Sequence, residues 1–245
     1  MNDSPIEQRV KHYWTQRAHD FGTVRQNELR DGISGRWLRE MEAYLPGERS
    51  LDILDVGTGT GYFAILLAGA GHRVTGIDLT PAMLAEAEKA ASDAGVSPRF
   101  LPMDAQATDL PGESCDAIVT RNLTWTLPDP EAAYREWARL LRPGGVLLNF
   151  DADYAENIRQ HNQQASRTDE KGVYGHIGMT PDLRRMNAEI TLSMPASLHR
   201  RPEWDLDLLR AAGFAACGAD LSAGKRILEE RDLPESPLFL VWARK

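Results

Sequence analysis

The segment 57–61, in which every other residue is glycine, has the spacing that most directly indicates a chemistry. It reads Gly57, Thr58, Gly59, Thr60 and Gly61. The apolar run 51–56, which carries Asp55, comes directly before it. Glycines at a strand-to-helix turn let backbone amides approach a bound ligand closely. A second short strand-like run, 73–77, precedes Asp78, whose carboxylate is suited to accept hydrogen bonds from ribose hydroxyls. Together the two patterns predict a site for a nucleoside-containing cofactor.

The glycine spacing also distinguishes between nucleoside cofactors. The dinucleotide-binding fingerprint is G-x-G-x-x-G/A, and its third small residue falls here on Tyr62, which is too bulky for close helix–strand packing. A P-loop needs Gly-Lys-Ser/Thr after its glycines, and this sequence lacks that motif there. A nucleotide-cofactor oxidoreductase is therefore the less favoured interpretation.

The pattern resembles motif I of the class I S-adenosylmethionine-dependent methyltransferases, and the chain is most similar to the type-11-like, small-molecule members. Four further segments continue the resemblance in the family's order. They are 78–83, similar to the ribose-binding acid and the helix start after it; 103–105, similar to the adenine-contact segment; 114–119, similar to the fourth strand; and 140–145, similar to the turn into the fifth.

The resemblance implies S-adenosyl-L-methionine as the cofactor and a set of residues that bind it. Arg121 and Asn122 are expected at the methionine end, whose carboxylate suits an arginine or an amide donor. In the first helix, Tyr13 is expected to face the positive sulfonium and Trp14 to anchor the helix, although both aromatics could simply pack onto the core. The predicted cofactor residues are Tyr13, Asp55, Gly57, Thr58, Gly59, Gly61, Asp78, Leu79, Met83, Asp104, Ala105, Arg121 and Asn122.

Strand and helix patterns alternate along the chain, which predicts an α/β fold with a mostly parallel sheet. The expected strands are 51–56, 73–77, 98–102, 115–120, 145–150, 214–219 and 238–243, with a further strand-like run at 188–194. The expected helices are 5–19, 24–45, 81–95, 130–142, 154–166 and 202–212. In the family these would form a Rossmann-like seven-stranded sheet, flanked by helices, with the last strand antiparallel.

The same reading divides a single methyltransferase domain, residues 1–245, into four parts. Residues 1–47 are expected to form an N-terminal helical lid, and 48–150 the cofactor-binding core. Residues 202–245 would complete the core with a helix and two strands. The intervening 151–201 is long for a connection after the fifth strand, and it starts at the sheet edge where ligands bind. It is interpreted as an inserted substrate cap, with an oligomerisation arm as the alternative.

The composition of the chain indicates which kinds of binding partner to expect. The 245 residues carry a net charge of −8, which argues against nucleic acid as the methyl acceptor. No apolar stretch approaches eighteen residues and the N-terminus does not resemble a signal peptide, so no membrane span and a cytoplasmic location are expected. The two cysteines have neither metal-binding nor redox spacing, and no metal site is predicted. The expected partner is a small molecule, with a homodimer as an option.

Catalytic residues are harder to assign. The candidates are Asp151, His161, His176 and Tyr13. Many family members have a His-His pair after the fourth strand, where this chain has Trp125-Thr126, so a general base is not assigned. Methyl transfer depends mainly on aligning two reactants and excluding water. The predicted function is therefore methyl transfer to a small molecule, with a cofactor-binding regulatory protein as the alternative. The acceptor and its reacting atom stay open.

Overall fold

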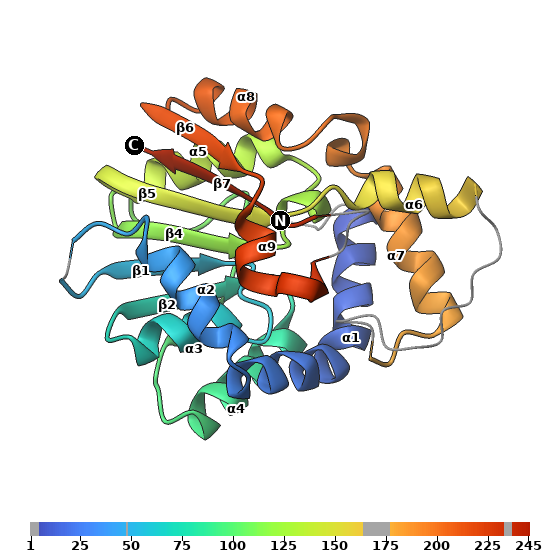
Figure 1. Cartoon of the computed structure of the whole chain (residues 1–245), viewed down its shortest axis with the longest axis horizontal. Helices are drawn as coiled ribbons and strands as arrows, with labels where there is room; N and C mark the ends of the chain where they lie inside the picture. Colours follow the sequence, from blue (N-terminus) through green and yellow to red (C-terminus); the bar gives the residue numbers. More distant parts are fainter. Residues whose placement is uncertain (1–4, 48, 164–176, 233–236) are drawn as a thin grey trace.

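The computed structural model describes residues 5–47, 49–163, 177–232 and 237–245, and it contains a seven-stranded sheet in the order β3-β2-β1-β4-β5-β7-β6 (Figure 1). The strands are β1 (Asp52–Val56), β2 (Arg73–Asp78), β3 (Arg99–Pro102), β4 (Cys115–Arg121), β5 (Leu141–Asp151), β6 (Ala216–Asp220) and β7 (Phe239–Arg244). Only β7 runs against its neighbours, since it pairs antiparallel with both β5 and β6. The predicted Rossmann-like sheet, mostly parallel with an antiparallel last strand, is confirmed.

Helices cover both faces of this sheet because side chains alternate along its buried strands. Ile53, Val119 and Leu148 point to one face, under α2 (Ile33–Glu42), α3 (Tyr62–Gly69) and α9 (Ala223–Leu228). Their neighbours Leu54, Ile118 and Leu147 point to the other, under α5 (Pro130–Leu140) and α8 (Glu203–Ala211). The short helices η1 (Thr124–Thr126), η2 (Pro195–Leu198) and η3 (Glu229–Arg231) lie in the connections. The carboxyl ends of the parallel strands are thereby held at one common edge.

Three helices stand beyond that edge. They are α1 (Pro5–Arg30), α6 (Tyr154–Gln163) and α7 (Pro181–Ser193), and Figure 1 shows α1 between the sheet and α7. Tyr13 of α1 packs with Leu183 and Ile190 of α7 in a small apolar cluster separate from the main core. At its other end α1 packs on α4 (Pro81–Asp93). Of the described helices, none combines the length and apolar character needed to cross a bilayer.

The structure corrects two of the predicted elements. The strand expected at 188–194 is part of helix α7, because Thr180 caps the helix by accepting a hydrogen bond from Leu183 N, 3.2 Å away. That cap and the helical spacing of the apolar residues outweigh the β-branched pair Ile190 and Thr191. The break expected near residue 20 falls instead at Asp31 and Gly32, so α1 runs unbroken from Pro5 to Arg30. Helix α9 is not anticipated by the sequence patterns.

Candidate functional site

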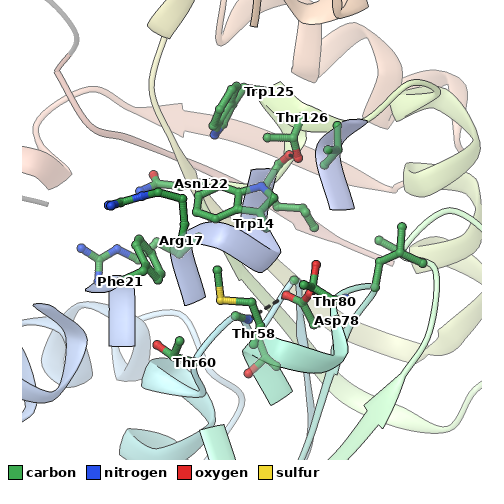
Figure 2. A pocket seen from close by; sticks show the side chains of 18 of the residues that line it. Trp14, Arg17, Phe21, Thr58, Thr60, Asp78, Thr80, Asn122, Trp125 and Thr126 are labelled. Atoms are coloured by element: carbon green, nitrogen blue, oxygen red, sulfur yellow. Dashed lines mark hydrogen bonds between the residues drawn. The ribbon is translucent and has the colours of Figure 1, made fainter. Parts of the chain in front are cut away.

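A cavity of about 310 Å³ opens where the carboxyl ends of the strands meet α1 (Figure 2). Its walls come from α1, from the ends of β1, β2 and β4, and from the starts of η1 and α6. The residues predicted to bind the cofactor all line it, except Gly61. The sequence therefore locates one continuous site on elements far apart along the chain.

The glycine turn, residues 57–61, forms the floor of this cavity. Asp55 fixes the turn, because its Oδ2 accepts hydrogen bonds from Thr58 Oγ1 at 2.6 Å and from Ala64 N at 3.0 Å. Gly59 has a φ of +55°, and a Cβ built there would meet only Phe21, 3.7 Å away. Gly61 also has a positive φ, but its missing side chain makes room for Ala87 and Phe100. Gly59 thus leaves space for a ligand, whereas Gly61 is needed for packing.

Burial changes the protonation of the acid that holds this turn. The Asp55 side chain is buried beneath the turn, and desolvation raises its pKa to about 7 despite the two hydrogen bonds that it accepts. Its carboxyl group therefore titrates near neutral pH. The hydrogen-bond geometry assigns it a structural position under the cofactor site.

Asp78 lies at the end of β2 beside the turn. Its Oδ2 accepts a hydrogen bond from Gly59 N at 2.9 Å and its Oδ1 accepts one from Thr80 N at 2.8 Å. Burial raises the pKa of this carboxyl group, while the two backbone donors and the Thr80 side chain oppose the rise. A carboxylate has about four lone-pair sites, so capacity remains for a ligand hydroxyl. Leu79 and Met83 line the same side of the cavity, and Asp104 and Ala105 line the wall after β3.

A buried arginine triad, Arg25–Glu28–Arg121, closes one end of the cavity. Glu28 accepts from Arg25 Nη1 at 2.6 Å and from Arg121 Nη1 at 3.0 Å, so one carboxylate serves two guanidinium groups. The pKa of Glu28 is lowered because the attraction of both arginines exceeds the cost of burial. The Arg121 guanidinium also lies 4.2 Å from the ring centre of Trp37. The triad carries one net positive charge next to the predicted position of the methionine carboxylate.

Sequence reasoning missed the contribution of α1 to this charge. Arg17, Phe21, Arg25 and Glu28 are three or four residues apart and so share one face of the helix. Arg17 is buried and donates from Nη1 to Ile177 O at 2.6 Å. The spacing of these residues was visible in the sequence, but an exposed charged stripe shows the same spacing. Only the packing of α1 over the sheet edge identifies the stripe as part of the cavity.

Several buried polar atoms that face the cavity have no hydrogen-bond partner in the described chain. They are Thr60 Oγ1, Tyr62 Oη, Arg121 Nε, Asn122 Oδ1 and Trp125 Nε1. Asn122 also has a φ of +56°, an uncommon conformation for a residue with a side chain. A buried polar atom without a partner costs free energy, and strain of this kind concentrates at functional sites. These atoms are suited to a polar ligand.

Aromatic side chains line the side of the cavity away from the glycine turn. The rings of Trp125 and Tyr154 lie 5.2 Å apart, and Met179 approaches from the start of the segment before α7. Tyr13 and Trp14 both line the cavity, but Tyr13 anchors α1: it is 4% exposed, and its hydroxyl donates to Met179 Sδ at 3.7 Å. Trp14 instead projects toward the centre of the cavity (Figure 2). Both residues therefore lie at the cavity, and each also packs in the apolar cluster that joins α1 to α7.

Asp151 is the catalytic candidate that the structure places outside the cavity lining. It is fully buried, and its Oδ2 pairs with Arg201 Nη1 at 3.0 Å. The same oxygen accepts a hydrogen bond from Trp125 N at 3.2 Å and another from Thr124 Oγ1. Arg201 in turn binds Asp205 of α8 at 2.8 Å. Asp151 therefore supports η1 from behind, and we no longer place it at the acceptor.

The two histidine candidates cannot be positioned in the same way. His176, like Tyr174 of the expected cap, lies outside the described residues, and His161 falls in the last turn of α6, where side chains are not described. Within the described ranges, no group of three histidine, cysteine or acidic side chains is arranged to hold a metal ion. Cys115 is buried and Cys217 half-buried, and both are free thiols.

Known proteins resemble this chain in sequence. Residues 54–149 match the family model described as a methyltransferase domain. The chain is 36% identical over 124 residues to a ubiquinone biosynthesis O-methyltransferase from Bordetella bronchiseptica, covering 50% of this chain and 48% of that one. It is 39% identical over 106 residues to a phosphatidylethanolamine N-methyltransferase from Cereibacter sphaeroides, covering 41% and 51%.

A solved structure extends the likeness in fold. The S-adenosylmethionine-dependent methyltransferase from Mesorhizobium loti superposes with a TM-score of 0.59 at 22% identity, covering 87% of this chain and 100% of that one. The chain spans about half the length of the curated relatives that it matches.

A seven-stranded sheet of this order, with a glycine turn after β1 and an acid after β2, defines a Rossmann-like methyltransferase fold. Within that class, residues 54–149 match the methyltransferase domain family, and relatives over 30% identical across this region are named as methyltransferases.

Proposed function

We propose that this chain binds S-adenosylmethionine in the cavity and transfers its methyl group to a small molecule. The observation that carries the proposal is the pairing of Asp78 with Gly59: the acid is tied to the turn at 2.9 Å and keeps free lone pairs beside the open space over Gly59. A ribose hydroxyl would complete that geometry. The curated relatives, which are named as methyltransferases, support the same proposal.

The residues divide along the cavity by chemistry. Asp78 would hold the ribose, and Asp104 and Ala105 would lie beside the adenine. The net positive arginine triad would attract the methionine carboxylate, although Glu28 already occupies both Nη atoms of Arg121. The unpartnered Oδ1 of Asn122 would accept a hydrogen bond from the methionine ammonium. The aromatic side is left for the acceptor.

When bound, the cofactor supplies a methyl group on a positively charged sulfur, which leaves as a neutral thioether while the acceptor's lone pair forms the new bond. The chain's part is to orient and to exclude water. Trp14 and Trp125 would hold a flat acceptor against the reacting end and cover it from solvent. Burial raises the pKa of Tyr13 and of Tyr154, so both phenols stay protonated near neutral pH and neither is poised as a base. The acceptor would therefore lose its proton to solvent before it is enclosed in the cavity.

A binding experiment tests the proposal directly. S-adenosylmethionine, S-adenosylhomocysteine and NAD are titrated into the protein by calorimetry. Both adenosyl compounds should bind in the micromolar range and NAD should not. A purified protein that binds NAD and neither adenosyl compound would overturn the assignment, whatever its acceptor.

The α1 helix and the segment 151–201 are proposed to cover the acceptor side. Their shared cluster of Tyr13, Leu183 and Ile190 supports this proposal, because it packs α7 directly against the helix that lines the cavity. Hydrogen exchange of the α1 and α7 amides should slow when S-adenosylhomocysteine is bound, relative to that of the free protein. Unchanged exchange in both helices would leave the segment a packing or oligomerisation element.

A further inference from the structure

The indole N–H of Trp125 is an unused donor on the acceptor side of the cavity. Trp125 is 8% exposed, and its Nε1 has no hydrogen-bond partner within the described chain. Figure 2 shows the nitrogen edge of the ring turned into the cavity, on the side where Asn122 and Trp14 lie. An indole can only donate, so the group that completes it must be an acceptor atom.

The surrounding structure holds this donor in one orientation. The Tyr154 ring packs against the indole at 5.2 Å between ring centres. Behind it, Trp125 N donates to Asp151 Oδ2 at 3.2 Å, and Asp151 is fixed by Arg201 at 3.0 Å. Because the buried ion pair fixes the backbone of Trp125, its indole N–H loses little conformational freedom when a ligand binds. Such preorganisation favours binding and specificity.

The neighbouring side chains indicate what kind of molecule fits. Thr126, Leu127, Ala152 and Tyr154, which line the cavity around Trp125, carry no charge at neutral pH. This described part of the wall therefore offers a cationic group no carboxylate. It offers instead the flat faces of aromatic rings, with one donor at their edge. A planar ring that bears an oxygen meets both features.

Resting on the proposed function, we propose that Trp125 selects the acceptor: a flat aromatic molecule whose oxygen, next to the position that is methylated, accepts a hydrogen bond from Trp125 Nε1–H. The ring of the acceptor packs in the aromatic part of the cavity, and the hydrogen bond sets which of its atoms faces the methyl group. Trp125 is thus a specificity-determining residue, and it does not take up the acceptor's proton.

The test uses the protein saturated with S-adenosylhomocysteine and two probes, catechol and phenol, which differ by one neighbouring oxygen. Their affinities are measured by calorimetry for the unaltered chain and for Trp125→Phe, which keeps an aromatic ring but removes the N–H. Trp204→Phe is the matched control, because Trp204 stacks on His199 at 4.4 Å and does not line the cavity. Both variants are first checked for folding by their thermal transitions.

Catechol should bind the unaltered chain about 2- to 12-fold more tightly than phenol, which is the range for one neutral hydrogen bond. Trp125→Phe should abolish that preference while leaving S-adenosylhomocysteine affinity unchanged, and Trp204→Phe should keep it. The inference is overturned, while the proposed function stands, if Trp125→Phe prefers catechol over phenol as strongly as the unaltered chain does. The same holds if catechol does not bind the saturated protein. A loss of S-adenosylhomocysteine affinity in Trp125→Phe would overturn the inference by assigning the N–H to the cofactor. Failure of the unaltered chain to bind S-adenosylhomocysteine would instead refute the proposed function.

Discussion

Replacing Asp78 with asparagine tests the role of the two carboxylate oxygens of Asp78 in cofactor binding. In the structure, Oδ1 accepts from Thr80 N at 2.8 Å and Oδ2 accepts from Gly59 N at 2.9 Å. A carboxylate has about four lone-pair sites, and the Thr80 side chain also bonds to this one, so the site that remains would take a ribose hydroxyl. Asparagine has the same shape but only one accepting oxygen and no charge.

The expected loss follows from this count. A hydrogen bond to a charged group contributes about 1.5–3 kcal/mol, so removing the charge and one accepting oxygen should weaken S-adenosylhomocysteine binding about 10- to 150-fold. Calorimetry at pH 8 is appropriate, because burial raises the pKa of Asp78 and the carboxylate must be ionised. The Asp52→Asn variant is a control, since Asp52 lies at the opposite end of β1 and pairs with Arg73 at 2.7 Å.

A second ligand shows whether the loss arises at the ribose. An S-adenosylhomocysteine analogue without its 2′ and 3′ hydroxyls should bind the unaltered chain more weakly than the natural ligand. In Asp78→Asn the same change of ligand should cost much less, because the shared interaction is already gone. If the two losses add in full, Asp78 does not contact the hydroxyls and the proposed orientation of the cofactor is wrong.

Three other changes separate stability from binding. Gly61→Ala should lower the melting temperature, because its Cβ would lie 3.0 Å from two neighbouring side chains, whereas Gly59→Ala should chiefly weaken S-adenosylhomocysteine binding, measured by calorimetry. Asp55→Asn should gain stability relative to the unaltered chain as pH rises from about 4 to about 7. Over that window the raised pKa of the Asp55 carboxyl group costs the unaltered chain folding free energy, and asparagine does not titrate. If denaturant unfolding gives the same stability difference between the two chains at pH 5 and at pH 8, this prediction is wrong. Arg201→Met should cost about 3–5 kcal/mol of unfolding free energy by leaving two buried carboxylates unpaired, whereas Arg200→Met, at a site 86% exposed, should cost little.

The cofactor half of the site could be predicted from the sequence because it is local. The turn at 57–61 and the acid Asp78 are each defined by neighbours within a few residues, and the sheet order then brings them together. The acceptor half could not, since Trp125 and Met179 come to line one cavity only through tertiary packing. Asp151 is a reasonable candidate by its position at the end of β5. Because successive side chains of a strand point to opposite faces, a shift of one residue decides whether a side chain faces the cavity or the core.

Helix α1 illustrates the same limit. Arg17 and Arg25 are spaced like any solvated helical stripe, and no local signal shows that this face is buried. Likewise, Ile190 and Thr191 favour a strand in isolation, and the distant cap at Thr180 decides for a helix. Patterns within a few residues were sufficient where the site is built from one turn, and insufficient where it is built from packed helices.

The ion pair between Asp151 and Arg201 also has a consequence for how the chain tolerates change. These two residues are 50 positions apart, yet their side chains meet at 3.0 Å, so one buried ion pair holds the two ends of the segment between them together. The cost of closing such a loop changes by only about 0.6 kcal/mol when its length doubles. Closure at this ion pair therefore places little restriction on the length of the segment, whose described part packs on α1 rather than on the sheet. A chain built in this way can acquire a new acceptor while the cofactor half of its site stays as it is.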